Sequence, residues 1–94
     1  MNNIEILDTA KKTVNGERQD SYGSPERNFQ MIADLWTVYL GMTVTAKDVA
    51  LMMGLFKIAR CRTGVGTVDS FIDLVGYAAL AGEIATEEKA NEGN

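Results

Sequence analysis

The sequence contains no histidine, and cysteine occurs once, as Cys61. Without histidine, the chain can form neither a Ser-His or Cys-His catalytic pair nor an ordinary Cys/His zinc site. Any metal ion bound here would have to be a hard cation with oxygen ligands, such as Mg²⁺. A lone cysteine excludes a disulfide framework within the chain, and this favours a reducing, cytoplasmic location.

Positive charge is also scarce, because 9 Lys and Arg residues stand against 13 Asp and Glu residues, for a net charge of −4. Non-specific nucleic-acid binding and adsorption to an anionic membrane both need a basic surface. The chain has no apolar run long enough to span a bilayer, and its first residues lack the pattern of a signal peptide. We therefore expect neither nucleic acid nor a membrane as a partner.

The spacing of apolar residues is helical throughout, and strand patterns are weak. Ser24 before Pro25 is typical of a helix start, as is Thr45 followed by Asp48, and Gly41 is typical of a helix end. The pattern predicts an all-α, four-helix bundle-like domain that comprises the whole chain, 1–94. The expected helices are at about 3–15, 25–40, 46–63 and 68–86, followed by a frayed tail, 87–94.

The helix expected at 25–40 has two opposed apolar faces. One side carries Phe29, Ile32, Ala33, Trp36 and Leu40, and the opposite side carries Met31, Leu35, Val38 and Met42. Both faces need covering, and three other helices are too few to cover all the apolar surface. We therefore expect a homo-oligomer to complete the bundle, with a tightly wrapped monomer as the alternative. Trp36, Tyr39 and the Met52-Met53 pair are expected in the core.

Four charged residues interrupt the two most apolar segments: Lys57, Arg60, Asp69 and Asp73. The short connection near Val65 predicts an antiparallel hairpin of helices, which would place Lys57 beside Asp73 and Arg60 beside Asp69. Charges in an apolar core are costly unless they are paired.

This cluster has two interpretations. It could be a pair of interhelical salt bridges that fix the helix register. It could also be a ligand site, in which Lys57 and Arg60 bind phosphate oxygens while Asp69 and Asp73 hold Mg²⁺. The sequence leaves both open.

A polar segment, 17–25, is the second candidate for a binding site. Asp20, Tyr22 and Asn28 offer a carboxylate, an aromatic ring and an amide, which suit base stacking and phosphate contact. The same composition suits an ordinary capped turn.

With these residues in view, the chain resembles a small phage and prophage family of uncharacterised proteins. The resemblance covers nearly the whole chain, and it implies the host cytoplasm as the location. The matching motifs are Asp20 to Pro25 with Asn28-Phe29, Trp36 and Tyr39, Asp48 to Met53, Lys57 to Arg60, and Asp69 through Asp73 to Ala78.

The chain is also distantly similar to MazG-like all-helical nucleotide pyrophosphatases. That resemblance implies a helical oligomer that hydrolyses (deoxy)nucleoside triphosphates with Mg²⁺ held by carboxylates, and Asp73 matches one of these acids. Ser70 stands where the family has a glutamate, and Lys57 and Arg60 have the spacing of an acidic pair with reversed charge.

Two functions follow from these observations. The first is a phage- or prophage-type nucleotide-binding protein, with a divergent Mg²⁺-dependent pyrophosphatase as its catalytic form. The alternative is a non-catalytic oligomeric module that binds another protein.

Overall fold

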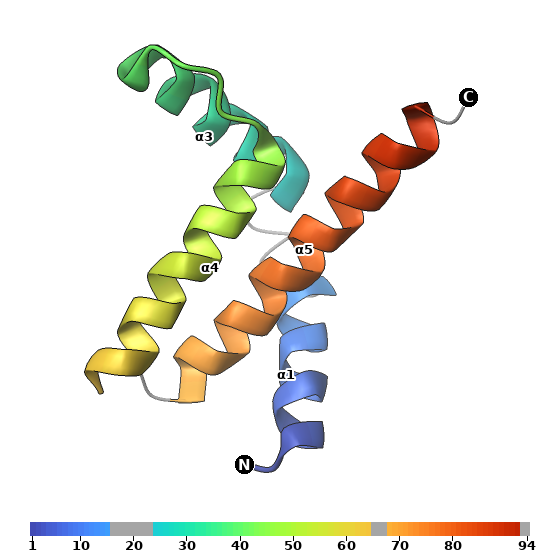
Figure 1. Ribbon diagram of the computed structural model, residues 1–94. Helices are drawn as coiled ribbons and strands as arrows, with labels where there is room; N and C mark the ends of the chain where they lie inside the picture. Colours follow the sequence, from blue (N-terminus) through green and yellow to red (C-terminus); the bar gives the residue numbers. More distant parts are fainter. Residues whose placement is uncertain (16–23, 65–67, 93–94) are drawn as a thin grey trace.

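The computed structural model describes residues 1–15, 24–64 and 68–92, and these residues form four helices (Figure 1). They are α1 (Asn3–Asn15), α3 (Pro25–Leu40), α4 (Ala46–Thr63) and α5 (Val68–Glu92). The all-α, four-helix arrangement expected from the sequence is confirmed.

The ends of α3 and α4 follow from their capping residues. Ser24 accepts a hydrogen bond from the backbone N–H of Arg27, Pro25 occupies the first helical turn, and Gly41 ends α3 with φ 70°. Thr45 and Asp48 form a capping box at the start of α4, in which each side chain accepts from the other's backbone N–H. These hydrogen bonds from Thr45 lower the pKa of the Asp48 carboxyl, because they stabilise its charged form.

The corner between α3 and α4 is closed by Thr37. Its Oγ1 accepts from the backbone N–H of Val44 at 2.8 Å and donates to the carbonyl oxygen of the same residue at 3.2 Å. Val44 is buried, so both of its backbone groups are satisfied without water. One side chain therefore fixes how α4 leaves α3.

Helices α4 and α5 form an antiparallel hairpin and share the most extensive contact in the described structure, while α1 lies along α5 and α3 packs on α4 (Figure 1). Gly76 allows α1 to approach α5 closely, because a Cβ atom there would lie 3.3 Å from Cγ2 of Val14. On the other side of α5, Leu74 reaches within 3.6 Å of the Cβ position of Gly54 on α4.

The core is small, and alanines contribute much of it. Its buried members are Phe29, Ala33, Val44, Ala46, Val49, Ala50, Ala81 and Ile84. Trp36, Met53, Tyr77 and their neighbours pack against this cluster and are only partly buried. The expectation that Trp36 and Met53 belong to the core is therefore confirmed.

Three expectations differ from the structure. Helix α5 continues to Glu92 rather than ending near 86, because the sequence from 87 to 92 contains the good helix formers Glu, Lys and Ala and no Gly or Pro. Tyr39 is exposed rather than buried, because it lies in the last turn of α3, about 80° around the helix from Phe29 and about 120° from Ala33.

Met52 is also exposed rather than buried. It lies about 120° around α4 from the buried Ala46, on the outer side of that helix.

The second apolar face of α3 is uncovered in the single chain. Met31, Leu35 and Val38 are exposed on this side of α3. Met42, the fourth residue expected on this face, is also exposed, but it follows the Gly41 cap and is not part of the helix. The residues of this face were expected to need a partner, and none of the described helices supplies one. Oligomerisation itself remains a prediction.

Candidate functional site

An ion pair links α4 to α5. Nζ of Lys57 lies 3.0 Å from Oδ2 of Asp73, and the two side chains are 17% and 28% exposed. The hairpin geometry predicted this pairing, which is confirmed. Water screens a pair at this depth less than it screens a surface pair. Removing one partner would leave a partly buried charge without compensation, which would destabilise the fold.

Phe56 lies near two basic side chains of α4, those of Lys57 and Arg60. Nζ of Lys57 is 5.7 Å from the centroid of its ring, and Cζ of Arg60 is 5.9 Å from it, both within reach of a cation–π attraction. Nε of Arg60 is buried and has no hydrogen-bond partner among the described residues. Asp69 is exposed on the first turn of α5, and its pairing with Arg60 stays a prediction.

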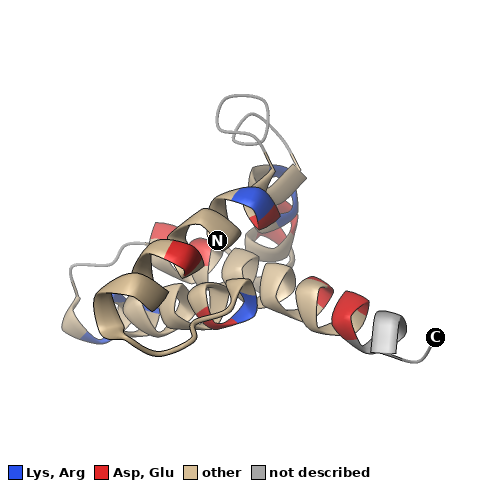
Figure 2. Ribbon diagram, turned by 90° about the horizontal axis from the view of Figure 1, so that it is seen from above, with Lys and Arg blue, Asp and Glu red and all other residues tan. Residues whose placement is uncertain are grey.

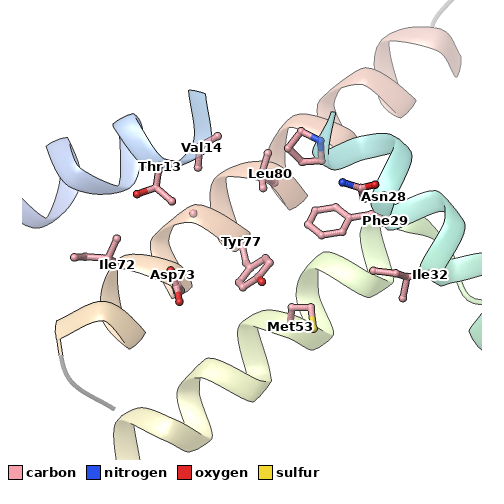
Figure 3. A pocket seen from close by; sticks show the side chains of 12 residues that line it. Thr13, Val14, Asn28, Phe29, Ile32, Met53, Ile72, Asp73, Tyr77 and Leu80 are labelled. Atoms are coloured by element: carbon pink, nitrogen blue, oxygen red, sulfur yellow. The ribbon is translucent and has the colours of Figure 1, made fainter. Parts of the chain in front are cut away.

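A pocket of about 210 Å³ lies next to this ion pair, and all four helices contribute to it (Figure 3). Most of its wall is apolar, formed by Val14, Phe29, Ile32, Met53, Ile72 and Leu80. The rings of Phe29 and Tyr77 are tilted against each other, with centroids 6.1 Å apart. The pocket thus offers aromatic and thioether surfaces to a flat, apolar group.

Four polar side chains interrupt this wall: Thr13, Asn28, Asp73 and Tyr77. In Figure 3, Asn28 and Asp73 lie on either side of Tyr77, so the amide and the carboxylate reach the pocket from α3 and α5. A mostly apolar pocket with a few placed polar groups is the usual form of a small-molecule site.

The structure brings together three of the seven residues predicted from the sequence. Asn28 and Asp73 both line the pocket, and Lys57 joins them through its ion pair. Arg60 and Asp69 are not among the described residues that line it.

The remaining two predicted residues, Asp20 and Tyr22, lie outside the described residues. The sequence predicts Met53 in the core, Phe29 on an apolar helix face, and Tyr77 within a family motif. Their apolar spacing alone could not show that a pocket opens beside them.

A second hollow, of about 420 Å³, lies between α3 and the C-terminal half of α5, and it is acidic. Glu26, Asp34, Glu87 and Glu88 line it, and acidic positions gather toward the C-terminal end of α5 (Figure 2). The charge of Glu26 is the main cause of a raised pKa at Glu87, because two nearby carboxylates repel each other. This hollow is unsuited to a phosphate.

Metal binding has little support in the described geometry. Within residues 1–15, 24–64 and 68–92, no group of three or more His, Cys, Asp or Glu side chains is arranged to hold a metal ion. Asp69 and Asp73 are one helical turn apart on α5, and Asp73 is already paired with Lys57.

None of the helices among the described residues is long and apolar enough to cross a bilayer.

Comparison with known proteins places the chain in a phage context. A family model described as "Domain of unknown function (DUF6378)" matches residues 5–85. The chain is 41% identical over 78 residues to the "Gene 55 protein" of Mycobacterium phage L5, a match that covers 82% of the chain and 50% of the relative. It is 40% identical over 87 residues to the "Gene 55 protein" of Mycobacterium phage D29, covering 93% of the chain and 58% of the relative.

The match thus spans 50% and 58% of the length of these two relatives. No solved structure matches it. The matches agree with the resemblance to a phage family of undefined function, whereas the resemblance to MazG-like pyrophosphatases stays a prediction.

Proposed function

The chain belongs to the family described as "Domain of unknown function (DUF6378)", and we propose that this phage-type protein binds a nucleotide. The observation that carries the proposal is the pocket between the four helices. It combines aromatic walls with an amide and a carboxylate, beside a basic residue of α4.

The apolar part of the pocket suits a nucleobase. The rings of Phe29 and Tyr77 and the thioether of Met53 present soft, polarizable surfaces on the pocket wall. A base is flat, and its faces gain free energy when they stack on such groups out of water. The base is therefore the part of the ligand that we place against these three residues.

The polar side chains suit the edges of a nucleoside. The amide of Asn28 has both donors and an acceptor, so it can pair with a base edge that carries both. The carboxylate of Asp73 is an acceptor, which suits a sugar hydroxyl. When the ligand binds, Asp73 would leave Lys57 or share it with the ligand, and Asn28 would do the same with its own present partner.

The phosphates would interact with the basic side chains of α4. Lys57 is next to the pocket because it forms an ion pair with Asp73, which lines the pocket. Arg60 is one turn further along the same helix. Hydrogen bonds between charged nitrogen donors and phosphate oxygens are stronger than neutral ones.

Hydrolysis is the less supported part of this proposal. A divergent pyrophosphatase would need Mg²⁺ to activate water and to neutralise charge on the phosphates. The predicted ligands, Asp69 and Asp73, are two carboxylates, and the second is paired with Lys57. This arrangement does not fit a carboxylate cage for Mg²⁺, so we propose binding without rapid hydrolysis.

A thermal-shift panel of nucleosides and nucleotides, with and without Mg²⁺, tests the proposal. A ligand that binds only the folded chain must raise the melting temperature by mass action. We expect a nucleotide to raise it in the wild type and in Asp8→Asn, an exposed control on α1. Asn28→Ala should reduce the shift, because it removes the amide from the pocket wall. No shift with any of these compounds would contradict the proposal.

Asp73→Asn separates the two possible roles of this carboxylate. If Asp73 helps to hold Mg²⁺, the variant should lose the Mg²⁺-dependent part of the nucleotide shift, because an amide lacks the charge that a hard cation requires. If Asp73 only pairs with Lys57, the variant should be less stable with or without ligand.

The second candidate function is a non-catalytic oligomeric module that binds another protein. The exposed apolar side chains of α3 and α4 favour it, because contiguous apolar surface on a small protein marks a contact site. Normal folding with no nucleotide response in the thermal-shift panel would favour this function over the first.

A further inference from the structure

The outer face of α4 is apolar although no described helix covers it. Helix α4 contacts α5 and α3 through its inner side, where Ala46, Val49 and Ala50 are buried. The residues on its outer side are exposed, and they include Leu51, Met52, Leu55, Phe56 and Ile58. Leu55, at the middle of this face, is 64% exposed.

This face is symmetric about Leu55. At 100° per residue, Leu51 and Ala59 lie about 40° to either side of the direction of Leu55, and Met52 and Ile58 lie about 60° to either side. An antiparallel second copy of α4, related by a two-fold axis at Leu55, would therefore bring apolar residues opposite apolar residues.

The two ends of the face carry opposite charges. Asp48 and Arg62 are each two helical turns from Leu55 and lie within about 20° of its direction. In the antiparallel arrangement, Asp48 of one chain meets Arg62 of the other at both ends of the contact. A parallel arrangement would instead bring like charges together, so the charges select the antiparallel one.

The surface area of the chain is large enough for such a contact. The chain exposes 6784 Å², whereas a compact monomer of 10.3 kDa exposes about 5400 Å². The excess of roughly 1400 Å² belongs to the whole chain, and it leaves room for the 800 Å² or so that each partner buries in a standard interface. We propose that the outer face of α4 binds a second copy of this chain, antiparallel and centred on Leu55.

This interface does not depend on the pocket ligand. Met53, the residue of α4 in the pocket wall, points about 160° away from Leu55 around the helix. The two copies would therefore meet on the side of α4 opposite to the pocket, and the oligomer can be tested without any nucleotide.

The decisive experiment uses opposite charges at the two-fold axis. Leu55→Glu and Leu55→Lys are made separately, and their masses are measured by analytical ultracentrifugation alone and as an equimolar mixture. Each variant alone places two like charges face to face, so each should have half the mass of the wild type. The mixture should recover the wild-type mass, because Glu then faces Lys. Circular dichroism checks that both variants remain helical.

Leu7→Glu on α1 is the matched control, since Leu7 is an exposed leucine outside the proposed interface, and it should keep the wild-type mass. Arg62→Glu should weaken the dimer about tenfold, because it faces Asp48 of the second copy, whereas Arg62→Lys should not. A monomeric wild type, a Leu55→Glu variant with the wild-type mass, or a mixture that does not reassociate would each overturn the proposal.

Discussion

Breaking the ion pair between Lys57 and Asp73 should destabilise the protein much more than breaking the pair between Lys47 and Glu88. The first pair has a 3.0 Å contact between side chains that are 17% and 28% exposed. The second has a 3.8 Å contact between side chains that are 39% and 49% exposed. Both pairs join α4 to α5, so the second is an internal control for the first.

The expected magnitude follows from the depth of the pair. Removing one partner of a fully buried pair costs about 3–5 kcal/mol, and exposed pairs contribute about 0–1 kcal/mol. Lys57 and Asp73 lie between these limits, so Asp73→Asn should lower the free energy of unfolding by about 2 kcal/mol. Lys57→Met keeps the apolar stem of the lysine, and combined with Asp73→Asn it should recover part of that loss.

A double-mutant cycle by urea denaturation, followed by circular dichroism at one fixed protein concentration, measures this coupling. The fixed concentration matters because self-association would itself add to stability. We expect a coupling of about 1–2 kcal/mol for Lys57–Asp73 and about 0.5 kcal/mol or less for Lys47–Glu88. Equal couplings for the two pairs would show that the depth of the first pair is energetically irrelevant, and the reasoning would be wrong.

Three further predictions concern single positions. Gly82→Ala should raise the free energy of unfolding by about 1 kcal/mol, because nothing lies within 4 Å of the added Cβ. Gly76→Ala should raise it by less, because the added Cβ would lie 3.3 Å from Cγ2 of Val14. Urea denaturation of both variants measures the difference. The lowered pKa of Asp48 gives stability that is present above its unfolded pKa of about 4 and lost as pH falls through the folded pKa, so the deficit of Asp48→Asn should shrink below pH 4 in acid titrations. Leu35→Glu should lower the mass or solubility of the assembly if the second face of α3 also contacts another copy, and an unchanged mass would leave that face without a role in assembly.

Local signals explain why the helix boundaries could be predicted. The Ser24-Pro25 and Thr45–Asp48 pairs determine helix starts through hydrogen bonds within a few residues, and the structure has both. The polar composition of 87–92 favours a frayed end, so the sequence does not predict the extension of α5 to Glu92. Glu and Lys have high helix propensity without any apolar face.

Long-range packing explains what could not be predicted. The Lys57–Asp73 pair could be predicted, because an antiparallel hairpin determines which residues of its two helices lie opposite each other. The pocket was not, since it depends on how closely α1 approaches Gly76 and on where α3 crosses α4. Neither quantity is encoded in apolar spacing, which also could not tell the exposed side of α3 at Tyr39 from its buried side.

The most direct test of nucleotide binding is methyl NMR of the wild type during titration with nucleosides and nucleotides. The Met53, Ile32 and Ile72 methyl groups belong to residues of the pocket wall, whereas Met31 is exposed on the outer side of α3. If the titration reaches about 1 mM ligand, a binding free energy near −4 kcal/mol is enough to half-saturate the protein, so weak binding is also detected. We predict shifts of the pocket methyl groups, with Met31 unchanged. Unshifted pocket methyl groups with every nucleotide tested would contradict the proposed function.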